Sequence, residues 1–389
     1  MKKIVHITSV HQRFDTRIFQ KECISLKNAG YDVSLVVADG KGDEIFEGIK
    51  IYDVGKESNR IKRLLFSSKK VIKKAKELNA DLYHYHDPDL LIASRSLTIN
   101  AHLVFDSHED FPALMLQRDY IPNILRKILF KLAKNIETKS AKQISAVVCA
   151  TDNIRDKFLA YGRVNAITIK NYPISNINQE PIDHSQIKPA KACYVGGLTP
   201  IRGVKEMIIA CQKAGVGLLL AGPFDSEEYF KQMQELSGWE NVEYLGYVPS
   251  KEVKERVYDK ACLGLVLLHK APNHTLSIPI KQLEYMASGL PSVSSKEVFF
   301  CKEVIEQDSC GIVVDPLNTD QVSEAIKTII NDSSLAKKMS SNAFQAAKEK
   351  YNWTSQEKAL ISLYKNLCND PKSLDKKTKG EQCIRNMII

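Results

Sequence analysis

Long hydrophobic runs are missing from this chain of 389 residues. No stretch reaches the roughly 18 consecutive apolar residues that a bilayer-spanning helix needs. The N-terminus enters a strand-like run at once (KKIVHIT), without a long apolar core or a cleavage signature, so we expect no secretory signal.

Paired cysteine spacings are missing as well. The nine cysteines are odd in number, scattered from residue 23 to residue 383, and never spaced as CxxC. This pattern argues against a disulfide framework and against a zinc site. A reducing, cytoplasmic setting fits it best.

The charge that is present is unevenly distributed. The chain has 55 Lys and Arg against 46 Asp and Glu, a net charge of +9. Residues 1–170 hold 29 basic and 20 acidic residues, whereas the remainder holds 26 of each. The length predicts about two domains with ample core, and the mixed composition excludes a disordered or collagen-like chain.

Short apolar runs alternate with longer amphipathic segments. Buried strands are predicted at 3–8, 33–38, 49–54, 81–85, 102–107 and 146–150, and again at 192–197, 216–222, 241–247, 262–268, 290–295 and 311–315. Helical patterns lie between them, for example at 16–29, 60–78, 123–141 and 279–288. This alternation predicts an α/β fold with doubly wound parallel sheets.

A break in the alternation divides the chain. Residues 171–190 contain three prolines and many polar residues, which predicts a linker. We expect an N-terminal domain at 1–170, a C-terminal domain at 191–350, a helix at 354–367 that packs back onto the first domain, and a basic, frayed tail at 370–389. Two such domains would bind a ligand at the carboxyl ends of their strands.

The most informative segment is PIKQLEYMASGLPSVSS, at 279–295. Pro279 suits the first turn of a helix, and Gly289 suits its C-terminal cap. Lys281 lies three residues before Glu284 on the same helix face, near the positive helix start. A helix start with a cation favours phosphate, and a carboxylate one turn deeper can accept two ribose hydroxyls. Spacing alone leaves open an ordinary surface ion pair.

This segment resembles the donor-site helix of GT-B glycosyltransferases, especially the large retaining group known as family 4. In that family the Glu matching Glu284 binds the nucleotide ribose, and backbone amides just before the helix, here around Ser277, hold the diphosphate. The family pattern has a further Glu upstream, which usually contacts the donor sugar, and this chain has Leu276 there. The resemblance therefore implies nucleotide binding and leaves the sugar open.

A second segment, CYVGGLTPIRGVKEMI at 193–208, resembles the family loop G-R-L-x-x-x-K-G, whose two cations grip the diphosphate. Gly197 occupies the first cationic position and Arg202 the second. One cation is retained, and Lys281 is expected to compensate for the other. A strand–turn–helix with a solvated Arg202 is the alternative.

Histidines follow two predicted strands of the N-terminal half. FDSHEDFPALM, at 105–115, resembles the family's strand-end segment, whose histidine contacts the donor sugar and the reacting centre; this implies a catalytic role for His108. A lone structural histidine is the alternative. The nearby run with His84, His86 and Asp87 is not interpreted as a metal site, because the histidines alternate along a strand and then enter a turn.

The first strand and helix, TSVHQRFDTRIFQKECISLKNAGYDVSLV at 8–36, resemble the start of a family subgroup with an H-x-x-x-D-x-R-I-F signature. The resemblance implies that His11, Asp15 and Arg17 shape the acceptor side. No GxGxxG is present. The alternative is a helix N-cap at Asp15 with Arg17 in a surface pair.

A basic, partly apolar segment at 60–76 is predicted to lie on an anionic membrane surface through Lys69, Lys70, Lys73 and Lys74. The segment at 124–143 has the same style. Solvated outer helices are the alternative. A nucleic-acid partner is not expected, because no basic platform is interleaved with aromatics.

These resemblances imply a GT-B fold and a retaining, metal-independent glycosyltransferase with a UDP- or GDP-sugar donor and no cofactor. They imply a glycan or polyprenyl-linked acceptor in bacterial surface polysaccharide synthesis, of the O-antigen or capsule type. The expected location is cytoplasmic, peripheral on the inner face of the plasma membrane. A GT-B nucleotide-sugar 2-epimerase and a non-catalytic sugar-nucleotide-binding subunit are the alternatives.

Overall fold

The chain folds as two units, each with its own sheet and core. The computed structural model describes residues 1–57, 66–97, 101–116, 121–174 and 181–369. Unit 1 comprises residues 1–171 and the described part of 356–389, and unit 2 comprises residues 172–355.

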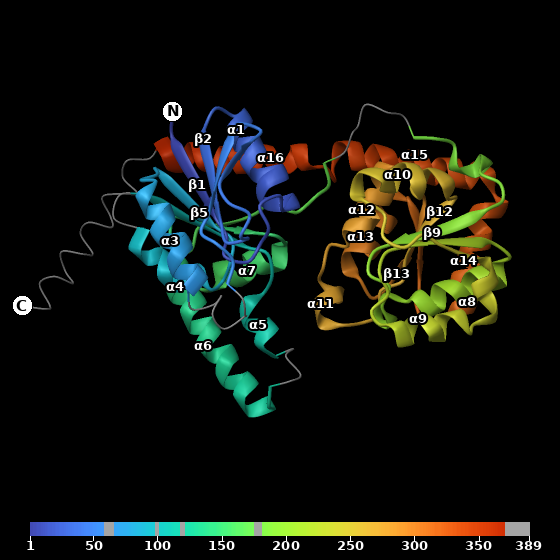
Figure 1. Cartoon of the computed structure of the whole chain (residues 1–389). Coiled ribbons are helices and arrows are strands. Elements are labelled where there is room, and N and C mark those ends of the chain that lie inside the picture. Colours follow the sequence, from blue (N-terminus) through green and yellow to red (C-terminus); the bar gives the residue numbers. More distant parts are fainter. Residues whose placement is uncertain (58–65, 98–100, 117–120, 175–180, 370–389) are drawn as a thin grey trace, which may run out of the picture. The chain divides into compact units, whose positions relative to one another are not determined.

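An eight-stranded sheet forms the centre of unit 1 (Figure 1). In sheet order the strands are β3 (Glu44–Phe46), β4 (Ile49–Asp53), β2 (Asp32–Val37), β1 (Lys3–Ile7), β5 (Leu82–Tyr85), β6 (His102–Ser107), β7 (Ala146–Cys149) and β8 (Ala166–Thr168). β3 pairs antiparallel with β4, and the other pairs are parallel. Chain order reverses between β1 and β5, which is where doubly wound sheets bind ligands.

Helices cover both faces of this sheet. They are η1 (Thr16–Cys23, a π-helix), α1 (Ile24–Asn28), α3 (Ser68–Glu77), α4 (Leu90–Ala93), η3 (Ser94–Leu97), α5 (Phe111–Leu116), α6 (Asn123–Ala141), α7 (Asp152–Ala160) and α16 (Trp353–Asn369). Side chains alternate along strands, so Val5 and Tyr83 pack in the core with α3 and α4. His6 and His84 point to the opposite face, where Tyr364 of α16 contacts His84.

Unit 2 has a six-stranded sheet with parallel pairing throughout the described strands. In sheet order these are β11 (Val242–Tyr244), β10 (Gly217–Ala221), β9 (Lys191–Val195), β12 (Leu263–Val266), β13 (Ser292–Ser295) and β14 (Gly311–Val314). Its helices are η4 (His184–Gln186), η5 (Pro200–Arg202), α8 (Val204–Ala214), α9 (Glu227–Gln234), η6 (Ser237–Asn241), η7 (Ser250–Glu252), α10 (Val253–Arg256), η8 (Tyr258–Lys260), α11 (Pro272–Thr275), α12 (Ile280–Ala287), α13 (Phe299–Asp308), α14 (Thr319–Asn331) and α15 (Ser333–Glu349). The switch point, where the chain order of the strands reverses, lies between β9 and β12. The predicted α/β architecture with two doubly wound sheets is confirmed.

The boundaries differ in detail from the expectation. His184, within the predicted linker, is buried in unit 2, and its ring nitrogens lie 2.8 Å from the Ala261 carbonyl and 2.9 Å from that of Ser288. The predicted basic tail at 370–389 and residues 60–65 of the basic segment lie outside the described residues. Among the described helices, none combines the length and the apolar character that a membrane span requires.

Candidate functional site

Asp106 and His108 stand at the end of β6 and are held together. His108 Nε2 lies 3.0 Å from Asp106 Oδ2, and the His108 side chain is 22% exposed whereas Asp106 is fully buried. The Arg17 guanidinium donates to both Asp106 oxygens, from Nε at 2.7 Å and from Nη2 at 2.8 Å. Burial alone would raise the pKa of Asp106, but the charge of Arg17 and the histidine contacts hold that pKa well below its usual range. The ionised carboxylate thereby orients the His108 ring.

The three residues predicted to shape the acceptor side take different places. Asp15 caps η1, since its Oδ1 accepts the backbone N–H of Arg17 at 2.9 Å. Arg17 itself is 4% exposed and occupied inside unit 1, so it does not form a loop surface. His11 is partly exposed. Burial lowers its pKa, but the nearby Asp15 and Asp87 raise that pKa by more, so the net shift is upward. The ring centroids of His11 and His108 are 5.1 Å apart, so the strand ends bring these two histidines together.

Among the described residues, two groups of side chains in unit 1 could bind a metal ion. One group is His86, Asp106 and His108, and the other is His6, Glu22, His84 and His86. From the sequence, His84 and His86 were not interpreted as metal ligands because they alternate along a strand. Alternation by two residues, however, places both on one face of β5. The parallel register pairs His6 with His84 on that face, which is the signal that the sequence analysis lacked.

The glycine-containing loop of unit 2 leads from β9 through η5 into α8. Gly203 has a φ of +76°, and a Cβ there would lie 2.4 Å from the Leu267 carbonyl oxygen, so glycine lets this loop approach the end of β12. Arg202 is partly buried, and its Nη1 donates to the Tyr194 hydroxyl at 3.2 Å. Gly197 carries no charge, which leaves Arg202 as the cation of this loop. The predicted cation thus lies beside the switch point.

Glu284 lies on α12, the helix before β13. Its Oε2 accepts hydrogen bonds from the Tyr258 hydroxyl at 2.5 Å and from Lys281 Nζ at 2.6 Å. No hydrogen bond between described residues reaches Oε1. Burial, and then the charge of Glu284, raise the pKa of Tyr258 well above its usual value, so the phenol stays protonated. Ser277, in the turn before α12, donates its hydroxyl to the His274 carbonyl at 2.8 Å.

The Lys281–Glu284 ion pair that the spacing allows is therefore formed. The two side chains are 28% and 29% exposed, so a ligand can reach both. Tyr258 was missed by the sequence analysis because it lies on η8, in a different element. Its only sequence signal is a tyrosine shortly before a buried strand, which by itself is typical of core packing.

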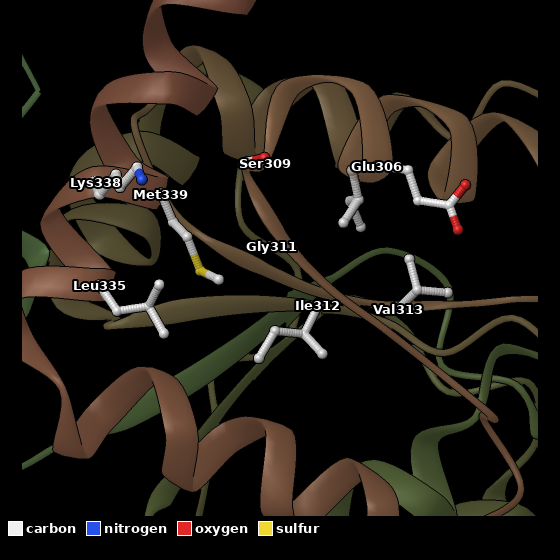
Figure 2. Close-up of a pocket in the computed structure, with 9 residues that line it drawn as sticks. Glu306, Ser309, Gly311, Ile312, Val313, Leu335, Lys338 and Met339 are labelled. Atoms are coloured by element: carbon white, nitrogen blue, oxygen red, sulfur yellow. The ribbon is translucent and has the colours of Figure 1, made fainter.

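A pocket of about 500 Å³ lies elsewhere in unit 2, between α13, α15 and β14. Figure 2 shows Leu335 and Met339 grouped beside Ile312, with Glu306 on the other side of the pocket. Its wall includes Gly311, Ile312 and Val313 of β14. The residues predicted to bind the donor lie in segments that follow the carboxyl ends of strands β9 and β12. None of them lines this pocket.

The predicted membrane lysines lie on the outer side of α3. Val71 and Ile72 of this helix are buried against the sheet, so its apolar face is used by the core. Lys70 also pairs with Glu57 at 2.7 Å. Exposed apolar side chains occur instead on α6, at Ile124, Leu125, Ile128 and Leu132.

Two family models match the chain in succession. The model described as Glycosyltransferase Family 4 matches residues 17–171, and the model described as Glycosyl transferases group 1 matches residues 178–346. An uncharacterized glycosyltransferase of Methanocaldococcus jannaschii is 28% identical over 177 residues, 44% of each chain. The putative teichuronic acid biosynthesis glycosyltransferase TuaH of Bacillus subtilis is 26% identical over 205 residues, 48% of this chain and 51% of its own length. The chain thus spans about half the length of these curated relatives.

Solved structures show the same fold at low sequence identity. Sucrose-phosphate synthase from Thermosynechococcus elongatus has a TM-score of 0.72 at 16% identity, covering 94% of this chain and 99% of that one. HepE of Anabaena, solved in complex with UDP-glucose, has a TM-score of 0.68 at 17% identity, covering 94% and 100%. WaaG, a glycosyltransferase involved in lipopolysaccharide biosynthesis, has a TM-score of 0.67 at 17% identity, covering 92% and 99%. The predicted GT-B fold is confirmed.

Proposed function

Because the chain belongs to the family 4-like glycosyltransferases with the GT-B fold, we propose that it transfers a sugar from a nucleotide-diphosphate sugar to an acceptor, with retention at the anomeric carbon. The observation that carries the proposal is the Glu284 carboxylate. Tyr258 and Lys281 fix it through one oxygen, and we propose that the other oxygen accepts ribose hydroxyls. Charge-assisted hydrogen bonds of this kind are the strong ones in nucleotide recognition.

The diphosphate would be bound by positive groups of unit 2. Arg202 lies in the glycine-containing loop, Lys281 lies in the first turn of α12, and the backbone amides around Ser277 precede that helix. When the bond between the anomeric carbon and the diphosphate oxygen breaks, the negative charge on the leaving oxygen grows. Fixed cations and amides stabilise that charge, so we propose a transfer step that needs no metal ion and no cofactor.

His108 is proposed to orient the sugar at the reacting centre. Its ring is anchored by Asp106 and yet partly exposed, which is the combination that a positioning group requires. The acceptor oxygen would attack on the face from which the diphosphate leaves, so the new bond forms with retained configuration and the acceptor proton is released.

UDP is the favoured nucleotide, with GDP as the second choice. The support is that HepE, which shares the fold, was solved with UDP-glucose. A glycan or polyprenyl-linked acceptor in bacterial surface polysaccharide synthesis is supported by the name of the Bacillus subtilis relative, which assigns that protein to teichuronic acid biosynthesis.

A peripheral position on the cytoplasmic face of the membrane is part of the proposal. The lysines of α3 would attract anionic lipid, and the exposed apolar residues of α6 add a surface that an interface can bury. Replacing Lys69, Lys70, Lys73 and Lys74 with Gln should weaken binding to phosphatidylglycerol vesicles by at most about 4 kcal/mol, at about 1 kcal/mol per charge. Co-sedimentation at low and high salt measures this, since salt screens surface attraction. Equal sedimentation of the variant and the parent would contradict the membrane contact of α3.

Incubation with a panel of UDP- and GDP-sugars tests the proposed reaction. Transfer to an acceptor, or slow hydrolysis of one nucleotide sugar, supports the transferase. An epimerised nucleotide sugar would instead identify a 2-epimerase. Binding without turnover would identify a non-catalytic subunit, an outcome for which Leu276 and Gly197 give a specific reason, since both replace charged residues of the family pattern.

A further inference from the structure

Four side chains of types that bind metal ions meet inside unit 1. His6 comes from β1, Glu22 from η1, His84 from β5, and His86 directly follows β5. All four are almost completely buried, and each offers one ligand atom such that the four atoms lie within 4.8 Å of one another. We propose that these four residues form a structural binding site for one divalent transition-metal ion of the zinc type.

The spacing of the ligand atoms suits a small tetrahedral site. His6 Nδ1 lies 2.9 Å from His86 Nε2 and 3.9 Å from Glu22 Oε2, which in turn lies 3.6 Å from His84 Nδ1. With metal–ligand bonds of about 2.0–2.1 Å, neighbouring ligands of a tetrahedral zinc ion lie roughly 3.3 Å apart. The three separations bracket that length, so small side-chain shifts would complete the site. Three imidazoles and one carboxylate favour zinc over magnesium or calcium, which prefer oxygen ligands.

Atoms without partners supply a second, independent observation. Glu22 Oε2 is buried and lacks a hydrogen-bond partner among the described residues, whereas Oε1 pairs with Arg17 Nε at 3.2 Å. A buried carboxylate oxygen without a partner is unfavourable unless it takes up a proton or binds a cation. The ring nitrogens that face Glu22 are His6 Nδ1 and His84 Nδ1; the unpartnered nitrogens of these two histidines, both Nε2, are the other ones. The binding capacity that the described residues leave unused in this cluster is therefore that of Glu22 Oε2.

The helix that carries Glu22 is built to present it. In an α-helix, two residues five positions apart point in directions that differ by about 140°. η1 is a π-helix, whose i→i+5 bonding brings Arg17 and Glu22 onto one face, with Arg17 Nε 3.2 Å from Glu22 Oε1. Arg17 thus holds one carboxylate oxygen and leaves the other facing the histidines. π-Helical turns are frequent at functional sites.

The surroundings supply the outer contacts of a metal centre. His86 Nδ1 lies 3.3 Å from Asp106 Oδ2, the carboxylate–histidine arrangement that orients metal ligands. Tyr364 of α16 lies 2.7 Å from His84 Nδ1, and ligation through that atom requires the hydroxyl to give up this contact. The ion would join β1, β5 and η1 beneath His108, where burial keeps substrates away. It is thus compatible with a metal-independent transfer step and does not depend on the proposed function.

Metal analysis of the full-length chain, purified without a metal-affinity tag, tests the site. We expect about one zinc ion per chain by elemental mass spectrometry. Prolonged treatment with a strong chelator should lower the melting temperature, and added zinc should restore it. Cobalt added to the stripped protein should give the visible absorption of tetrahedral Co²⁺. Glu22→Gln should lose the metal, whereas the matched control Glu77→Gln, at an exposed position of α3, should keep it.

The competing account is that Glu22 carries a proton, and the same experiments distinguish the two. In that account Gln mimics the protonated acid, so Glu22→Gln would be as stable as the parent. Absence of any first-row metal from the parent chain, together with no cobalt spectrum, would overturn the proposal even where Glu22→Gln fails to fold. Zinc retained equally by Glu22→Gln and the parent would also overturn it, because the metal would then bind elsewhere.

Discussion

The charged side chains near the strand ends differ between the two units in their burial and in how fully they are paired. At the strand ends of unit 1, Arg17 and Asp106 are buried and satisfy each other with a bidentate contact. In unit 2, Lys281 and Glu284 are partly exposed, and both contacts of the carboxylate fall on one oxygen. The first arrangement holds side chains in place, whereas the second leaves polar groups that a ligand can reach.

The largest effect is expected from breaking the buried pair of unit 1. Arg17→Met should destabilise the fold by about 3–5 kcal/mol, because it leaves the Asp106 charge buried and unpaired. Arg155→Met is the control, since Arg155 pairs with Asp152 and Asp156 at the surface, where a pair contributes about 0–1 kcal/mol. Urea denaturation followed by circular dichroism measures both. Equal losses in the two variants would show that the buried pair does not hold unit 1 together.

A smaller effect, on binding and not on stability, is expected in unit 2. Glu284→Ala should weaken UDP binding by about 1.5–3 kcal/mol, the usual contribution of hydrogen bonds to a charged group. That corresponds to roughly a tenfold to hundredfold rise in Kd, measured by titration calorimetry. Glu303→Ala, at an exposed position of α13, is the matched control. Unchanged affinity in a folded Glu284 variant would remove this carboxylate from the nucleotide site.

The smallest expected change in free energy is that of a His108 variant, which should affect the rate of transfer and not the binding of UDP. His108→Ala should lower transfer by at least tenfold, about 1.4 kcal/mol, while the fold and the UDP affinity stay nearly intact. The physical reason is that His108 belongs to unit 1, whereas the proposed nucleotide contacts belong to unit 2. Steady-state kinetics combined with calorimetry measures the two quantities. Wild-type turnover in this variant would return His108 to a structural role.

Sequence reasoning predicted local features well and long-range partners poorly. The strand–helix alternation, the glycine-containing loop and the Lys281–Glu284 spacing are encoded within short segments, so pattern alone located them. The partners of these residues are encoded by sheet register and packing. Arg17 and Asp106 are 89 positions apart, and His6 meets His86 from 80 positions away. No local periodicity carries such a pairing, so the contact between Arg17 and Asp106 was not predicted.

Amide hydrogen exchange with and without UDP tests the contrast between the units most directly. We expect UDP to slow exchange in the loop at 196–204 and in the segment at 277–287 of unit 2, where the proposed ligand contacts lie. The buried strand ends of unit 1 around Asp106 should already be protected without ligand and should change little. Slowed exchange confined to unit 1, with 196–204 and 277–287 unchanged at saturating UDP, would contradict the account.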